Sequence, residues 1–300
     1  MVVPNWKSGL QEIADGVFAY INAEPRAAIC NSGIIIGDDG VMVIDGLMVD
    51  SMVRPYLEQI RKVTSKPSRY VVNTHHHIDH SFGNQFYLPA EVLGHRACRE
   101  IMLVRGVDQE DLGKRFPMYK KDWPKVRLTP PSVTYEDKMV VHLGDRVVEL
   151  LHPGAAHTYG DTLIYMPKEK VLFTGDVAFQ YLTPLAADGH ISHWIRVEES
   201  IINNLDATTI VPGHGPVGDK TALVLTLGYL KLLKRTSRLH FKRGASVDDA
   251  ARAMRLGEYA DWEEPERVLR NMARAFQEFR GELPKPLRTR FDKGLHVAPR

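Results

Sequence analysis

The prediction of the fold starts from residues 73–80, which read Asn73-Thr74-His75-His76-His77-Ile78-Asp79-His80. Four of these eight residues are histidines, and an aspartate lies among them. The residues just before them, Arg69-Tyr70-Val71-Val72, are typical of a short apolar strand, because β-branched and aromatic side chains favour strands. The histidines are therefore expected where a strand ends and a loop begins, on a rigid support.

The side chains of this loop are expected to point in alternating directions. In an extended or turning segment, residues two apart share a side. This places His75, His77 and Asp79 on one side, turns His80 slightly away and directs His76 elsewhere. Imidazoles and a carboxylate that converge this closely are the ligands that a divalent metal of the zinc type requires. A histidine-rich surface loop is the alternative, but the rest of the chain supplies further ligands.

The pattern His75-x-His77-x-Asp79-His80 resembles the signature of the metallo-β-lactamase superfamily. That signature implies three more ligands at strand ends downstream: a histidine, an aspartate and a last histidine in a Gly-rich turn. The chain contains all three segments in the family's order: Pro153-Gly154-Ala155-Ala156-His157-Thr158, Leu172-Phe173-Thr174-Gly175-Asp176 and Val211-Pro212-Gly213-His214-Gly215. One short motif would be weak evidence, whereas four in sequence are strong.

The resemblance implies a pair of metal sites. One is formed by three histidines, the other by an aspartate and two histidines, and one aspartate bridges them: His75, His77 and His157; Asp79, His80 and His214; and Asp176. Each ion keeps an open position for water, as catalytic zinc sites do. Two such ions about 3.5–4 Å apart can share the hydroxide that acts as the nucleophile. The expected metals are two divalent ions, Zn²⁺ first, with Fe or Mn as alternatives. Asp79 is also the predicted catalytic proton carrier.

Other polar residues near these motifs are candidates for orienting the ligands or contacting substrate. The threonines that flank ligands are Thr74, Thr158 and Thr174, and a structural role at strand ends is equally open for each. Tyr159 and Tyr181 are candidate donors to an oxyanion, and His190 or His193 can reach the cleft after Asp176. The pattern does not need His76, His142 or His152, which we expect to be exposed or hydrogen-bonded histidines.

Composition bounds the class of protein. A chain of 300 residues with 44% apolar and 25% charged residues is ordinary for a soluble globular protein of one large or two modest domains. The net charge of +2 argues against a polyanion-binding surface. No signal peptide is visible at the start, and the most apolar run, 221–233, is too short to span a bilayer. Cys30 and Cys98 are far apart and lack metal-type spacing. We therefore expect a cytoplasmic protein that does not associate with membranes.

Apolar runs bounded by turns predict strands in two series. The expected strands are 17–21, 32–36, 41–44, 70–73 and 91–94 in the first series, and 139–143, 147–151, 162–165, 170–173 and 208–211 in the second. Helical spacing of apolar residues predicts helices at 49–63, 96–104 and 194–205. Two sheets, each flanked by helices, give an αββα sandwich in the α/β class, which the resemblance also implies.

Two segments fall outside this sandwich. Residues 106–131 are charged and contain four prolines, and we interpret them as a cap-like insertion in a catalytic domain of residues 1–218. Long loops in compact domains tend to be lids or binding loops, although a plain surface excursion is the alternative. Residues 219–300 are expected to be a helical region, with a capping box at Ser246 and Asp249. We expect this region to pack on the sandwich, with a homodimer surface or a pocket wall as the alternative.

Three enzyme classes and one binding class fit these features. The first is a dinuclear zinc hydrolase that attacks a lactam, lactone, ester or thioester of a small molecule. Its segment from His157 to Asp161 is similar to that of glyoxalase II-like, lactamase-like predicted hydrolases, and less similar to that of lactonases and glyoxalase II. The second is a phosphodiesterase or nuclease, which should carry a basic stripe that the near-neutral charge does not indicate. The third is an iron-loaded redox member of the same superfamily. A non-catalytic binding module is the last.

Overall fold

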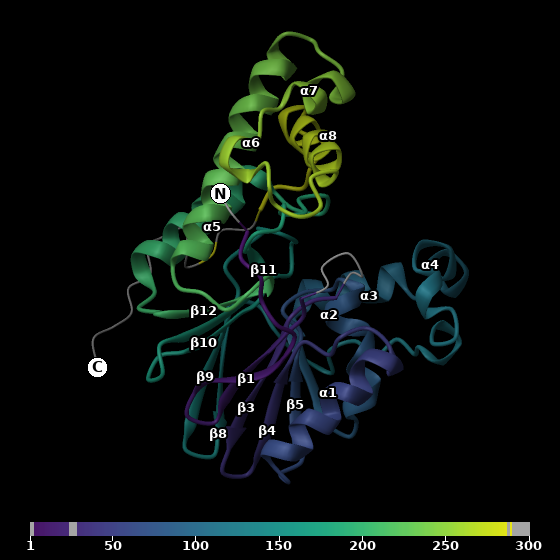
Figure 1. Ribbon diagram of the computed structural model, residues 1–300, viewed down its shortest axis with the longest axis vertical. Helices are drawn as coiled ribbons and strands as arrows, with labels where there is room; N and C mark the ends of the chain where they lie inside the picture. The colour runs from purple at the N-terminus through teal and green to yellow at the C-terminus, as the bar shows by residue number, and fades with distance from the viewer. Residues whose placement is uncertain (1–2, 24–28, 287–288, 290–300) are drawn as a thin grey trace.

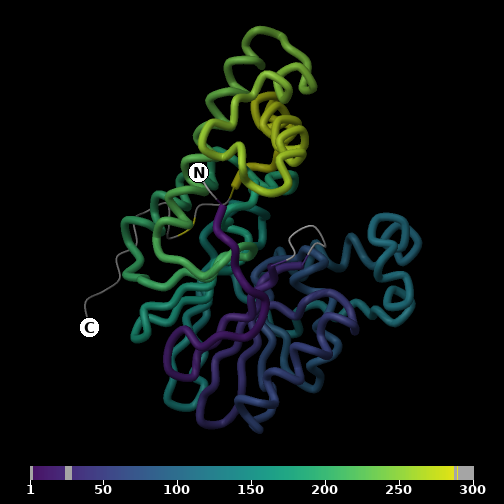
Figure 2. The backbone as a smooth tube through the Cα atoms, in the orientation of Figure 1, coloured from purple at the N-terminus to yellow at the C-terminus, as the bar shows by residue number. Residues whose placement is uncertain are grey.

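The computed structural model describes residues 3–23, 29–286 and 289 of the chain (Figures 1 and 2). Its first sheet has seven strands, which lie side by side in sequence order: β1 (Gly9–Ala14), β2 (Val17–Ile21), β3 (Ser32–Gly37), β4 (Gly40–Ile44), β5 (Ser68–Val72), β6 (Glu91–His95) and β7 (Val133–Tyr135). The pairs from β1 to β4 are antiparallel, and those from β4 to β7 are parallel. Gly37 pairs with Gly40, so residues 37–40 form a tight hairpin turn between β3 and β4.

The second sheet has five strands in the order β12-β11-β10-β9-β8. Their bounds are β8 (Lys138–Leu143), β9 (Arg146–Leu151), β10 (Leu163–Met166), β11 (Val171–Phe179) and β12 (Thr209–His214). The pairs are antiparallel except for β11 and β12, which run parallel. Apolar side chains of both sheets, among them Ile44 and Val72 from the first and Phe173 and Val211 from the second, share one buried cluster. The two sheets therefore pack face to face.

Helices cover the outer faces of this sandwich (Figure 1). On the first sheet, α1 (Asp50–Val63) buries Val53, Tyr56 and Ile60 in one cluster with Val43 and Val71. On the second sheet, α5 (Ile191–Asn204) and α6 (Thr221–Lys242) share a large apolar cluster with β11. Two smaller helices, α2 (Ile78–Ser81) and α3 (Arg96–Arg105), follow β5 and β6. The predicted αββα sandwich is confirmed.

The carboxy-terminal helices form a bundle at one end of the molecule (Figure 1). Besides α6 it contains α7 (Val247–Ala253) and α8 (Arg267–Phe279), and its apolar residues belong to the cluster that covers the second sheet. Ser246 caps α7, since its hydroxyl oxygen accepts a hydrogen bond from the backbone N–H of Asp249 at 3.1 Å. The predicted helical extension is therefore present. The domain boundary at residue 218 and the homodimer stay predictions.

Residues 106–131 contain α4 (Gln109–Arg115) and two short 3₁₀ turns, Pro117–Tyr119 and Trp123–Lys125. Leu112, Trp123 and Val126 form a small buried cluster with Met48 and Phe82, so this insertion packs on the sandwich beside α2. None of the helices in the described ranges is long and apolar enough to cross a membrane.

Three local features differ from the sequence prediction. The strands β1 and β7 were not predicted, because β1 alternates poorly and stays half-exposed, while β7 has three residues. The extended loop predicted for residues 75–80 is wrong beyond His77, which is still extended (φ −63°, ψ 152°) and caps the one-turn helix α2. Asp79 and His80 are thus presented by a helical turn, where adjacent residues point about 100° apart.

Candidate metal centre

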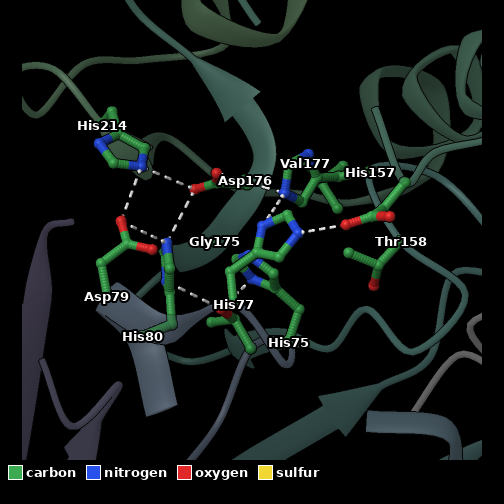
Figure 3. A network of polar contacts seen from close by, with 12 residues as sticks. His75, His77, Asp79, His80, His157, Thr158, Gly175, Asp176, Val177 and His214 are labelled. Atoms are coloured by element: carbon green, nitrogen blue, oxygen red, sulfur yellow. Dashed lines mark hydrogen bonds and ion pairs between the residues drawn. The ribbon is translucent and has the colours of Figure 1, made fainter. Parts of the chain in front are cut away.

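The candidate ligands meet at the carboxyl ends of neighbouring strands (Figure 3). His75 and His77 follow β5, and His157 lies in the loop between β9 and β10. Asp176 lies within β11, and His214 is the last residue of β12. Because β11 and β12 run parallel, their carboxyl ends reach the same edge of the sheet, where α/β proteins tend to place their sites.

His75, His77 and His157 form a compact group, the three-histidine cluster. The centroids of their rings are 4.7 Å apart in each of the three pairs. Nδ1 of His77 lies 2.9 Å from Nε2 of His157, which in turn lies 3.4 Å from Oδ2 of Asp176. One ligand atom from each of these four residues lies within 4.8 Å of the others, which is the spacing that one divalent ion requires.

Asp79, His80 and His214 form the second cluster. Nε2 of His80 and Nε2 of His214 lie 3.2 and 3.4 Å from Oδ1 of Asp176. The same two nitrogens lie 3.6 and 3.5 Å from Oδ2 of Asp79. Asp176 therefore turns one oxygen to each cluster, which is the arrangement of a bridging carboxylate (Figure 3).

The two clusters fit a pair of divalent cations. Nε2 of His75, Nε2 of His80 and Oδ1 of Asp176 are buried and have no hydrogen-bond partner among the described residues. This arrangement is destabilising unless another group satisfies these atoms. Burial lowers the pKa of His75 well below its ordinary value and that of His157 to about 3, so both rings are neutral and offer a lone pair. Neutral imidazoles and carboxylates are the donors that zinc-type ions bind.

Asp45, which the sequence analysis did not identify, supports the second cluster from behind. Its Oδ2 lies 2.8 Å from Nδ1 of His80, the nitrogen that faces away from Asp176. It also accepts hydrogen bonds from the backbone N–H and the hydroxyl of Thr74, at 2.7 and 2.8 Å. The Thr74 hydroxyl lies 3.0 Å from Nδ1 of His75. Thr74 therefore connects both clusters to Asp45, a position from which its hydroxyl can orient the two imidazoles.

Asp188 is the corresponding residue behind the three-histidine cluster, and the sequence analysis did not identify it either. Its Oδ2 lies 2.8 Å from Nε2 of His77. Arg105 donates two hydrogen bonds to the same carboxylate, at 2.7 and 3.0 Å. Burial alone would raise the pKa of Asp188, but the hydrogen bonds from His77 and Arg105 lower it below its usual range. The carboxylate is therefore ionised and fixes the orientation of the His77 ring.

The loop that carries His157 is held by Asp161. Its carboxylate accepts hydrogen bonds from the backbone N–H of Ala156 and from the N–H and hydroxyl of Thr158, the last at 2.6 Å. Burial raises the pKa of Asp161 to about 7 in spite of these bonds, which lower it. The Thr158 hydroxyl thus shapes the loop instead of contacting an imidazole.

Five other predicted site residues are not among the described residues that line the cavity beside the clusters: Tyr159, Thr174, Tyr181, His190 and His193. The Thr174 hydroxyl donates to the carbonyl of Gly175 at 2.8 Å, which is a role at a strand bend. The Tyr159 hydroxyl donates to the carbonyl of Pro284 at 2.6 Å. The geometry therefore gives no support to an oxyanion donor at Tyr159.

The remaining three predicted residues contact an N-terminal aromatic ring, the C-terminal region and the backbone, respectively. The ring of Tyr181 stacks on Trp6, with centroids 6.3 Å apart. Nδ1 of His190 lies 3.5 Å from Oε2 of Glu278, and Nδ1 of His193 lies 2.8 Å from the carbonyl oxygen of Ala155. Both histidines have partners outside the two clusters.

The histidines that the motif did not require differ from one another. His142 is exposed, and His152 is buried, with Nδ1 2.7 Å from the carbonyl oxygen of Asp161. These two positions agree with the prediction. The position of His76 differs from the prediction, because His76 is buried and neither of its ring nitrogens has a hydrogen-bond partner in the described part of the chain. Its Nε2 lies 3.8 Å from Oδ2 of Asp188.

A cavity of about 500 Å³ opens beside both clusters. His77, Asp79, Asp176 and His214 border it, and its apolar walls include Phe82 and residues of the insertion and of the loop after β11. Charged side chains of the insertion and of the C-terminal region complete the rim: Asp108, Asp111, Arg115, Glu264, Glu266, Arg267 and Arg270. The pocket-wall alternative for the C-terminal region thus has direct structural support.

Comparisons with known proteins identify similar sequences. A family model described as the metallo-beta-lactamase superfamily matches residues 25–214. The chain is 27% identical over 207 residues to the 2,4-dinitroanisole O-demethylase subunit alpha of Nocardioides sp. (strain JS1661), which covers 67% of this chain and 54% of that protein. It is 30% identical over 230 residues to the acyl-coenzyme A thioesterase MBLAC2 of Homo sapiens, which covers 68% of this chain and 80% of that protein. The chain spans about half the length of the O-demethylase subunit.

Solved structures share the fold. A metallo-beta-lactamase from Pontibacter korlensis superposes with a TM-score of 0.61 at 20% identity, over 75% of this chain and 99% of that one. The sec-alkylsulfatase Pisa1 from Pseudomonas sp. superposes with a TM-score of 0.69 at 19% identity, over 92% of this chain and 51% of that one. The second likeness extends the shared fold beyond the sandwich.

Proposed function

Because the chain belongs to the metallo-beta-lactamase superfamily and is a hydrolase of that family, we propose that it uses two divalent metal ions, Zn²⁺ in the first place, to break an acyl bond. The observation that carries the proposal is the pair of histidine and aspartate clusters that share Asp176 beside one cavity. In this proposal the three-histidine cluster would hold one ion and the second cluster the other, and Asp176 would offer one carboxylate oxygen to each.

Different residues of the chain have different roles in the proposed hydrolysis. Two divalent ions, when bound, acidify a water molecule and polarise the scissile oxygen of the substrate. Asp45 and Asp188 keep the ligating nitrogens of His80 and His77 directed at the centre. Oδ2 of Asp79 is close to the second-cluster nitrogens, and the residue borders the cavity, so it is placed to take and release a proton.

A thioester is the acyl bond that the comparisons favour. The relative with 30% identity over 68% of this chain is named as an acyl-coenzyme A thioesterase. The cavity suits an acyl group, since Ile78, Phe82, Met102, Leu112 and Phe116 supply apolar contacts close to the clusters. The proposed substrate is therefore a small thioester, with esters, lactones and lactams as weaker alternatives.

Two other classes are less well supported. A phosphodiesterase or nuclease needs an excess of cations along its groove. The rim of this cavity shows no such excess, because Asp108, Asp111, Glu264 and Glu266 lie beside Arg115, Arg267 and Arg270. An iron-loaded redox enzyme would not require the complete second cluster. Fe and Mn remain alternative metals for the hydrolase itself, and metal analysis distinguishes them from Zn²⁺.

The proposal also includes the cellular compartment and the oligomeric state of the enzyme. Cys30 and Cys98 are free and buried, in keeping with a reducing compartment such as the cytoplasm. A homodimer through the C-terminal helices is part of the same proposal, and light scattering of the purified protein tests it.

The experiment combines metal analysis with a substrate panel. Purified protein is expected to contain two divalent ions per chain by mass spectrometry. It is expected to release free thiol from short acyl-CoA thioesters in a colorimetric assay. The panel also holds a p-nitrophenyl ester, a lactone, a β-lactam, bis(p-nitrophenyl) phosphate and a secondary alkyl sulfate.

Three variants make this test specific. His77→Ala and Asp176→Ala are expected to abolish turnover while circular dichroism shows a folded protein. His142→Ala removes an exposed histidine of β8 and is expected to keep full activity. Turnover confined to the phosphodiester or the sulfate would overturn the acyl assignment. Undiminished activity in His77→Ala or Asp176→Ala would overturn the proposed site.

A further inference from the structure

One face of helix α8 holds the loop that follows β11. Four polar side chains, spaced four, three and four residues apart, lie on that face, since such spacing returns to the same side of a helix. All four form hydrogen bonds with the backbone of residues 183–192, here named the clamp segment. The four residues are Arg267, Asn271, Arg274 and Glu278.

Asn271 makes the most buried of these contacts. Its side chain is fully buried, and its Oδ1 accepts a hydrogen bond from the backbone N–H of Ala186 at 2.7 Å. Its Nδ2 donates to the carbonyl of Pro184 at 2.7 Å and to the hydroxyl of Tyr229 at 2.8 Å. A buried amide with all these bonds satisfied fixes the clamp segment at one position on the helix.

Arg274 and Glu278 hold the far end of the clamp segment. Nε of Arg274 donates to the carbonyl of Gly189 at 2.7 Å. The carboxylate of Glu278 accepts from the backbone N–H of Ser192 at 3.2 Å, at the start of α5. Nδ1 of His190 faces the same carboxylate at 3.5 Å.

The clamp segment in turn contacts the His77 side chain and the backbone beside His157. Its Asp188 carboxylate lies 2.8 Å from Nε2 of His77. The backbone N–H of His190 donates to the carbonyl of Ala156, next to His157, at 3.0 Å. Gly189 packs on the same backbone so closely that a Cβ there would lie 2.6 Å from the Ala156 carbonyl oxygen. A shift of the clamp segment therefore moves both histidines.

We propose that α8 is a positioning element for the three-histidine cluster, in which Asn271 and Arg274 act through the clamp segment on His77 and His157. The inference rests on the proposed function in that these histidines hold a metal ion. Helix α8 lies beyond residues 25–214, the part of the chain that the family model matches. The chain thus couples its C-terminal bundle to a metal site that is built entirely within the family domain.

The test uses the whole 300-residue chain with three variants and a matched control. Arg274→Ala removes the bond to Gly189, and Arg274→Lys keeps a donor at the same position. Arg280→Ala is the control. Arg280 is the first residue after α8, is exposed and pairs with Glu282 instead of the clamp segment. Asn271→Ala serves as a second, more buried perturbation.

Two measurements decide the outcome. Amide hydrogen exchange is recorded without metal. In Arg274→Ala and in Asn271→Ala, exchange is expected to become faster at residues 186–190 and 155–158, and to stay unchanged in strands β8 and β9. Titration with Co²⁺ is expected to show an altered visible spectrum and about 10–100-fold weaker binding of one of two ions, as losses behind a metal ligand usually give. Arg274→Lys is expected to recover part of this loss, and Arg280→Ala to match the unchanged protein.

The proposal is overturned if Arg274→Ala and Asn271→Ala lower thermal stability but leave the exchange of those residues and the cobalt spectrum unchanged. In that case α8 would contribute packing alone. An unaltered protein that binds no Co²⁺ would instead refute the proposed function. The exchange comparison, which needs no metal, would still decide whether α8 positions His77 and His157.

Discussion

Replacement of Asp188 by alanine should weaken one metal site and spare the other. Asp188 contacts Nε2 of His77 at 2.8 Å, and no contact joins it to His80 or His214 in the described part of the chain. Its removal leaves His77 free to rotate and Arg105 without its partner. A lost partner behind a ligating histidine typically weakens binding by about 10–100-fold, which corresponds to roughly 1.4–2.7 kcal/mol.

The assay is competition for Zn²⁺ between the protein and a fluorescent chelator. Asp188→Ala is expected to retain one ion at the original affinity and to hold the other about 10–100-fold more weakly. Turnover should then return when excess Zn²⁺ is added, because the catalytic residues are intact. Asp206→Ala is the control, since Asp206 is exposed and pairs with Lys170 far from the clusters. If both ions bind as tightly as before, or if both bind more weakly by the same factor, the proposed role of Asp188 in orienting His77 is refuted.

Three further predictions concern other residues of the centre and the core. Asp45→Asn should weaken the other ion by a similar factor, because Asp45 lies behind His80, and the same competition assay measures this. Gly175→Ala should prevent binding of both ions, because Gly175 has φ 51° and a Cβ there would lie 2.5 Å from the Thr74 hydroxyl. Metal analysis measures this loss, and circular dichroism should show that the β-sheet content is retained. Glu198 is fully buried in α5, and burial raises its pKa well above its ordinary value despite the opposing effect of Trp194. The folded state therefore prefers the neutral acid, and stability falls as pH rises from about 4.3, the ordinary value, toward the folded-state pKa. Glu198→Gln should raise the unfolding temperature at pH 8 and change it little at pH 4 in scanning calorimetry.

The sequence predicted the elements whose residue pattern is local. The strands and the longer helices follow from apolar periodicity, and the hairpin at 37–40 follows from its glycines and aspartates. The short helix α2 could not be predicted in this way, because four residues are too few to show a helical period. The same limit applies to the three-residue strand β7.

The histidine loop could be predicted from its density of histidines after a strand, and His157, Asp176 and His214 from the resemblance to the superfamily signature. Asp45 and Asp188 carry no such signal. Each is a single aspartate in a turn or loop, and its role depends on partners 35 and 111 residues away in the chain, His80 and His77. Only the packing of the segments shows which carboxylate supports which imidazole. The clue for Asp45 was its position directly after β4, beside the strand that delivers the histidines.

The two clusters and the walls of the cavity come from different parts of the fold. Asp176 and His214 lie in β11 and β12, where sheet hydrogen bonds fix the backbone, whereas His77 and His157 lie outside the strands and depend on neighbouring segments for their position. The cavity walls come instead from the insertion, which has its own small core around Trp123, and from α8. Pocket residues on α8 such as Arg267 and Arg270 share the helix with Asn271 and Arg274, which hold the clamp segment. A substrate that moves α8 at the pocket would therefore change the position of His77, so recognition and metal geometry are joined through one helix.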